Sequence, residues 1–216
     1  MPLNPLLPPQ QPSAALIRSR RRRIPHGLRR QLGLSLPETM VVIVISIVAA
    51  IVSYPTVKGF WIELRVPSTA SELQRYMSRT KLLGESDNPT PYAAIDTAKN
   101  LVPAMQDSSV FRVNGKVVAH RLGGTGLGTN GTITVAPAAL GGGPMGSAFS
   151  VTLTNVNATA CPTLASTLNG VSETISVNGT AAKTLGANNE TGSFNPVTAQ
   201  DLCVKGDSNT FVFATR

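Results

Sequence analysis

The sequence predicts an α+β protein in which a long N-terminal helix packs on an antiparallel β-sheet head. Three features indicate this fold: an almost wholly apolar run near the N-terminus, an amphipathic helical pattern directly after it, and a change to short alternating segments from about residue 84. We expect the helix to cover residues 34–83, with residues 34–57 in a membrane, and the head to cover residues 84–216. The head has about 130 residues, enough to bury one modest core.

Residues 1–33 form a basic leader ahead of the apolar run. The leader has no acidic residue and holds seven arginines: Arg18, Arg20, Arg21, Arg22, Arg23, Arg29 and Arg30. Because positive charge stays on the cytoplasmic side of a membrane, the leader directs the C-terminal head outward. The chain carries a net charge of +8, so without the leader only about +1 remains. The basic run has no folded platform or interleaved aromatic residues, so we expect no nucleic-acid partner.

The apolar run is long enough to span a membrane. Thr39–Val57 contains nineteen residues without a charge, and about 20 apolar residues cross a bilayer. An ordinary secretory signal peptide has a small-residue cleavage site after its apolar core, and none follows Val52. We therefore expect this segment to remain in the protein and to contact membrane lipid.

Glu38 is the only ionisable residue of the apolar segment that begins at Leu34. A carboxylate in a membrane helix costs roughly 2.5–3.5 kcal/mol near the centre and less near an end. Such a group usually has a partner. If a protease cut after Gly33, the new amino group of Leu34 would be a cation at a similar depth, and Glu38 of one chain could pair with Leu34 of the next.

The hexapeptide from Gly33 to Glu38, after an arginine-rich leader and before an apolar helix, resembles the class III signal peptide of type IV pilins and pseudopilins. The resemblance implies cleavage after Gly33 by a prepilin peptidase, N-methylation of Leu34 and packing of the helices into a fibre core. Leucine after the cut and a leader of 33 residues resemble the type IVb branch. Pro37 departs from the commonest motif, but proline is tolerated in a first helical turn.

Two prolines interrupt the helical pattern of residues 34–83. Pro55 and Pro67 each remove a backbone hydrogen bond and are expected to kink or loosen the helix. In the pilins that the chain resembles, the helix melts locally around a comparable proline on assembly. We therefore assign Pro55 as a helix kink.

The head shows short strands separated by turn pairs. Asn114-Gly115 and Asn178-Gly179 each stand between apolar alternations and fit two-residue type I′ hairpin loops. Residues 161–170 predict a short helix that ends at Gly170. Residues 210–215 alternate as a strand does.

The only two cysteines are Cys161 and Cys203, both in the outward-facing head. An oxidising compartment favours a disulfide between them, and two buried free thiols are the alternative. Closing this loop of about 43 residues stabilises a fold by up to roughly 4 kcal/mol in the chain-entropy model. In type IV pilins such a pair closes a C-terminal segment called the D-region, which here would be residues 161–203.

Catalytic chemistry has little support in the sequence. His120 is the only histidine outside the leader and is expected at the surface, on or beside a strand, and two cysteines form no zinc cluster. Residues 123–128 are glycine-rich but lack the spacing of a dinucleotide fingerprint and the lysine of a P-loop, so a mobile surface loop is expected. We predict no catalytic residue, no cofactor and no metal.

The resemblance implies a structural subunit of a type IVb pilus, used for adhesion, aggregation or conjugative mating-pair contact. Its partners would be other copies of the chain, the prepilin peptidase and N-methyltransferase, and the pilus assembly machinery. The precursor is expected in the inner membrane and the product in a surface fibre. A minor pilin, a type II secretion pseudopilin and a membrane-anchored periplasmic binding domain that never polymerises are the alternatives.

Overall fold

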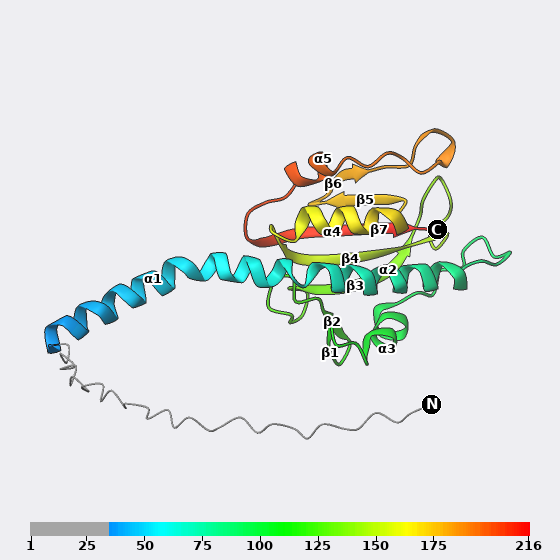
Figure 1. Ribbon diagram of the computed structural model, residues 1–216. Helices are drawn as coiled ribbons and strands as arrows, with labels where there is room; N and C mark the ends of the chain where they lie inside the picture. The colour runs from blue at the N-terminus through cyan, green and yellow to red at the C-terminus, as the bar shows by residue number, and fades with distance from the viewer. Residues whose placement is uncertain (1–34) are drawn as a thin grey trace, which may run out of the picture. The chain divides into compact units, whose positions relative to one another are not determined.

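The computed structural model describes residues 35–216, so the leader, Gly33 and Leu34 lie outside the described residues. Contacts divide the chain into two units, residues 1–45 and 46–216. Figure 1 labels the helices and strands of the described residues. The helices are α1 (Leu36–Glu63), α2 (Val66–Leu83), the π-helix η1 (Thr97–Leu101), α3 (Val102–Met105), α4 (Cys161–Leu168), the short 3₁₀ turns η2 (Asn169–Val171) and η3 (Ala187–Asn189), and α5 (Pro196–Asp201). The strands are β1 (Arg112–Asn114), β2 (Val117–Ala119), β3 (Thr132–Ala138), β4 (Ala148–Asn157), β5 (Thr174–Val177), β6 (Thr180–Lys183) and β7 (Asp207–Thr215).

The stretch expected as helix over residues 34–83 contains two helices, with a turn at Leu64 and Arg65 between them. Pro67 lies in the first turn of α2. A proline cannot donate to the carbonyl of the residue four positions earlier, which here is Glu63, the last residue of α1. The break therefore falls where Pro67 requires it, while α1 stays helical through residue 55.

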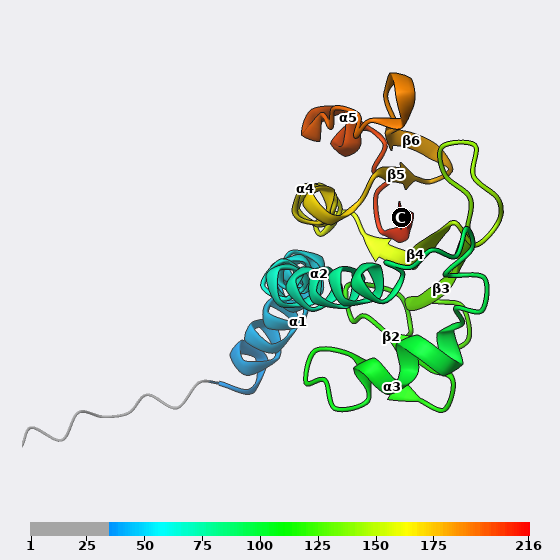
Figure 2. The ribbon, with the colours of Figure 1, turned by 90° about the vertical axis from the view of Figure 1, so that its right-hand side faces the viewer.

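All seven strands join one antiparallel sheet in the order β1-β2-β3-β4-β7-β5-β6. The C-terminal strand β7 lies inside the sheet, between β4 and β5. Helices α2 and α4 lie side by side on one face of the sheet (Figure 2). The expected fold class, a helix packed on an antiparallel sheet with a disulfide-closed C-terminal region, is confirmed.

The core lies between α2, α4 and the sheet. On α2 the buried apolar residues Val66, Ala70, Leu73 and Met77 recur every three or four positions, which places them on one face of the helix. On the strands, the largest fully buried side chains are those of Phe149, Phe211 and Phe213. The register pairs Val151 with Phe213 and Leu153 with Phe211, so alternate residues of β4 and β7 share the buried face.

Two predicted hairpins are present. The β5–β6 hairpin has the expected loop, with Asn178 and Gly179 both at positive φ. The β1–β2 hairpin forms, but its loop is Gly115-Lys116 rather than Asn114-Gly115, because Asn114 pairs with Val117. The predicted C-terminal strand is β7, and the predicted helix after Cys161 is α4.

Candidate assembly and anchoring site

The first turn of α1 gives Glu38 a local partner. The Ser35 N–H donates to Glu38 Oε2 at 3.4 Å, and the Glu38 and Thr39 N–H groups donate to Ser35 O at 2.9 and 3.0 Å. Ser-x-x-Glu is the sequence of a capping box, of which this geometry forms one half. A carboxylate in a first turn is also favoured by the helix dipole. Because a carboxylate can accept about four hydrogen bonds, the contact with Ser35 leaves room for a cation.

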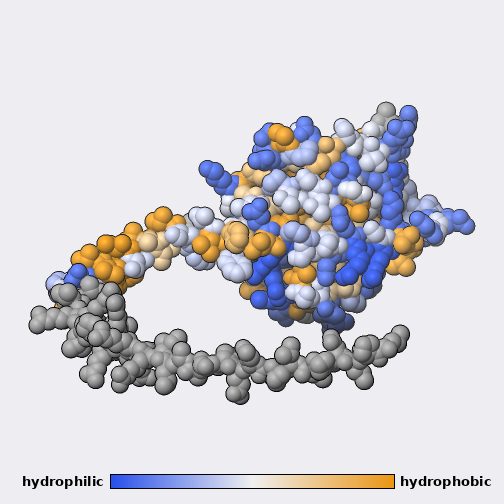
Figure 3. Space-filling view, viewed as in Figure 1, coloured by the Kyte–Doolittle hydropathy of each residue, from blue (hydrophilic) through white to orange (hydrophobic). Residues whose placement is uncertain are grey.

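The segment Leu36–Tyr54 of α1 has the length and composition of a membrane span. Its 19 residues have a mean hydropathy of 2.3, and its most apolar window is not buried by the rest of the chain. The side chains of α1 accordingly form an apolar surface, orange in Figure 3. Leaving so many large apolar side chains in water is costly, so this surface needs lipid or protein around it.

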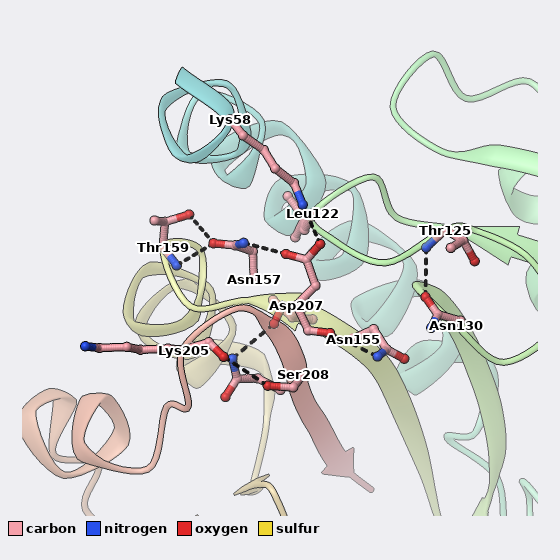
Figure 4. Close-up of polar contacts among 12 residues, drawn as sticks. Lys58, Leu122, Thr125, Asn130, Asn155, Asn157, Thr159, Lys205, Asp207 and Ser208 are labelled. Carbon is pink, nitrogen blue, oxygen red and sulfur yellow. Dashed lines mark hydrogen bonds and ion pairs between the residues drawn. The ribbon is translucent and has the colours of Figure 1, made fainter. Parts of the chain in front are cut away.

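The last turns of α1 are tied to the sheet by an ion pair. Lys58 Nζ lies 2.6 Å from Asp207 Oδ2, and Asn157 donates to the other oxygen of the same carboxylate (Figure 4). Burial raises the pKa of Asp207, but the hydrogen bonds from Lys58 and Asn157, the charge of Lys58 and a Gly124 N–H outweigh it. The pKa of Asp207 is therefore lowered from its usual value of 3.8. Asp207 begins β7, so this contact connects α1 to an inner strand of the sheet.

Cys161 and Cys203 form a disulfide with a Cα–Cα distance of 6.3 Å, within the usual range. Cys161 is the first residue of α4, and Cys203 follows α5 by two residues. The enclosed residues contain most of α4, all of α5 and the strands β5 and β6. The bridge thus closes a segment that also contributes two strands to the sheet.

His120 is buried, so the expectation of a surface histidine is wrong. Its Nε2–H donates to Thr154 O at 2.8 Å, and its Nδ1 accepts from the Leu122 N–H at 3.0 Å. With both ring nitrogens used in this way, the ring is neutral and Nδ1 carries no proton. Burial lowers the pKa of His120 to about 4, against smaller opposing effects of the Thr154 carbonyl and the Asp207 charge.

The neutral His120 makes the head acid-sensitive. Its pKa lies below the unfolded value of 6.5, so the unfolded chain binds more protons between about pH 6.5 and 4. The free energy of unfolding should fall by about 3 kcal/mol as the pH drops through this window, and His120→Gln should remove most of that slope. Urea titrations of both proteins at several pH values measure it. Parallel pH profiles for the two proteins would show that His120 is not the cause.

The proposed site residues belong to different units of the chain. Glu38 lies in the first turn of α1, and Cys161 and Cys203 lie in the head. The glycine-rich residues 123–128 are held as an ordered loop. The Thr125 N–H donates to Asn130 Oδ1 (Figure 4), and the Gly126 N–H donates to Asn130 O. Among residues 35–216, no group of three or more His, Cys, Asp or Glu side chains is placed to hold a metal ion.

Sequence reasoning missed two features of this site. The first is the hydrogen bond from the Ser35 N–H to Glu38. The spacing Ser35-x-x-Glu38 is that of a capping box and could have predicted it. The second is the ion pair between Lys58 and Asp207, which are 149 positions apart in the sequence. No local sequence pattern predicts a contact at that separation.

Three comparisons place the chain among known proteins. A family model described as PilS N terminal matches residues 66–216. The solved type IV b pilin from Salmonella typhi is similar at 17% identity and a TM-score of 0.45, over 68% of this chain and 94% of that one. TcpA, a type IV pilin from Vibrio cholerae El Tor biotype, is similar at 15% identity and a TM-score of 0.45, over 72% and 99%. A search of curated proteins finds no match.

Proposed function

Because the chain belongs to the PilS N-terminal family of type IV pilins, we propose that it is the structural subunit of a type IVb pilus. One observation carries the proposal: an unburied apolar helix, with a single acid in its first turn, is joined to a disulfide-closed head. This arrangement suits a subunit that is held in a membrane first and in a bundle of helices afterwards. Its role is structural rather than enzymatic.

Processing supplies the first step of the proposed function. A prepilin peptidase cuts after Gly33 on the cytoplasmic side, and Leu34 is N-methylated. Cleavage removes the arginine-rich leader, so the new N-terminus can leave the cytoplasmic face of the membrane together with α1. Without the cut, seven arginines would have to enter the hydrocarbon, at roughly 2.5 kcal/mol or more for each one near its centre.

Assembly then buries α1 against the helices of other copies. Apolar burial contributes about 25 cal/mol per Å² once the helix leaves the bilayer. Glu38 of one subunit pairs with the amino group of Leu34 of the next, which sets the register along the fibre. Pro55 lies where α1 leaves the apolar segment, and a kink there would let the helix adjust to its neighbours.

The fibre would serve adhesion, aggregation or mating-pair contact. The test is to shear cells that produce the chain and to ask whether the chain is released in fibres, using cells without the peptidase as the matched control. We expect release only where the peptidase is present. A chain that stays uncut in the membrane of both strains would instead be an anchored periplasmic domain, and a processed chain found only as a trace component of fibres would be a minor pilin.

A further inference from the structure

A basic and aromatic cavity opens beside the last turns of α1. Its volume is about 540 Å³, within the range of small-ligand sites. Tyr54 and Trp61 of α1 line one side, and Ala119, Arg121 and the glycine-rich residues 123–126 line another. Among the described lining residues four are basic and none is acidic. The basic ones are Lys58, Arg65, Arg112 and Arg121.

One of the four basic side chains of this cavity forms an ion pair: Lys58 pairs with Asp207. Arg65, Arg112 and Arg121 are exposed and form no ion pair within residues 35–216. Three guanidinium groups around one cavity repel one another, and their planar donors match the geometry of a phosphate group. The chemistry of the cavity thus favours a phosphate-bearing anion.

The glycine-rich wall of the cavity is fixed by close packing. Gly123 has φ +149, and a Cβ there would lie 2.4 Å from Asn155 O. Gly124 has φ +67, and a Cβ there would lie 2.7 Å from the backbone of Gly131. Side chains are excluded at both positions, so this loop lies close against β4 and the start of β3. The cavity is therefore built by the fold and does not depend on a free loop.

The position of the cavity along α1 indicates the source of the anion. Tyr54 is the last residue of the candidate span, and Lys58 lies one turn further, about 6 Å along the helix. The headgroup layer of a bilayer is roughly 5–8 Å deep on each side. Tyrosine and tryptophan are enriched at this depth, and Val57, which lines the cavity and is 51% exposed, offers apolar surface for an acyl chain.

We propose that this cavity binds the headgroup of an anionic phospholipid while the subunit is anchored in the membrane. The phosphate contacts Arg65, Arg112 and Arg121, and the acyl chains lie along the apolar surface of α1. The inference rests on the membrane-anchored stage of the proposed function. It adds a site that holds the subunit at a fixed depth and that must be vacated when the subunit enters a fibre.

Trp61 provides the measurement, because it is the only tryptophan of the chain, lines the cavity and is 57% exposed. The full-length protein in detergent micelles is titrated with dihexanoyl phosphatidylglycerol, dihexanoyl phosphatidylcholine and inorganic phosphate while Trp61 emission is recorded. We expect a saturable change with phosphatidylglycerol at about tenfold lower concentration than with phosphatidylcholine. An equal response to inorganic phosphate would mean a general anion site and would overturn the lipid assignment.

Arg112→Gln and Arg65→Gln should each weaken the phosphatidylglycerol response about tenfold. Arg79→Gln is the matched control, because Arg79 is an exposed arginine of α2 outside the cavity. Unchanged titrations of both cavity variants would overturn the proposal. So would an emission change that follows protein concentration instead of lipid, since the occupant would then be a second copy of the chain.

Membrane fractionation of the same protein separates this inference from the proposed function. If the chain sediments with membranes but shows no preference for phosphatidylglycerol, the proposed headgroup site is overturned and the proposed function stands. If the chain does not sediment with membranes, the membrane-anchored stage is overturned as well, and both proposals fail.

Discussion

Glu38→Ala is expected to give a processed, disulfide-bonded subunit that stays in the membrane and forms few or no fibres. In the fibre, the amino group of each Leu34 would lose its partner in an apolar environment. An unpaired charge there costs roughly 2.5–3.5 kcal/mol, which corresponds to about a hundredfold loss of assembly. The head should be unaffected, because the hydrogen bond that the Glu38 side chain accepts comes from Ser35, in the first turn of α1. Quantification of sheared fibres measures the effect.

Glu38→Gln separates the charge of Glu38 from its local hydrogen bond. A glutamine can still accept the Ser35 N–H and complete the same half of the capping box, but it carries no charge. If pairing with Leu34 matters, the glutamine variant should fail to assemble almost as completely as the alanine variant. Wild-type fibre yields from Glu38→Gln would reduce the role of Glu38 to helix capping.

Removal of the disulfide is expected to have the second large effect, on the stability of the head. Replacing both Cys161 and Cys203 with alanine opens a loop with a sequence separation of 42. The free energy of unfolding should fall by up to roughly 4 kcal/mol, which lowers the melting temperature by roughly 8–16 °C for a domain of this size. A thermal melt of the double variant, followed by near-ultraviolet circular dichroism, measures the change.

The reduced wild-type protein is the control for that melt, since it lacks the bond but keeps both sulfur atoms. It should melt close to the double variant. The pairing of β5 with β7 from Thr174 to Val177 keeps the enclosed segment in the sheet, so we expect a weakened fold and not an unfolded one. A melting temperature equal to that of the oxidised protein would show that the sheet alone holds this segment.

Elements with a local cause could be predicted from the sequence. The β5–β6 loop has both residues at positive φ, which asparagine and glycine adopt most easily. The Asn114-Gly115 pair was equally typical of such a loop, yet the loop lies one residue later, which moves each cross-strand partner by two residues. A loop at 114–115 would put Lys116 opposite Val113, whereas the observed register puts the buried Val118 there and leaves Lys116 in the loop. Both registers keep Val118 on the same face of the sheet, so the local alternation did not distinguish them.

Features that depend on distant residues could not be predicted. His120 is buried because Thr154 and the backbone of Leu122 satisfy its ring, and Thr154 belongs to another strand. The position of β7 between β4 and β5 follows from the whole sheet. The basic cavity is lined by residues from 54–65 and from 112–126, two segments far apart in the sequence. No sequence motif marks its arginines. Local patterns describe helices, loops and processing motifs, whereas such contacts arise only when the chain folds.

The intact mass of the protein released by shearing tests the central claim most directly. The account predicts the mass of residues 34–216 with one amino hydrogen replaced by a methyl group, a net gain of CH2, and with two hydrogen atoms lost to the disulfide. Such a mass shows cleavage after Gly33, one methylation and an oxidised cysteine pair, and its release by shearing shows export to the cell surface. Absence of the chain from the sheared material, together with a full-length species in the membrane, would contradict the account and identify a subunit that does not polymerise.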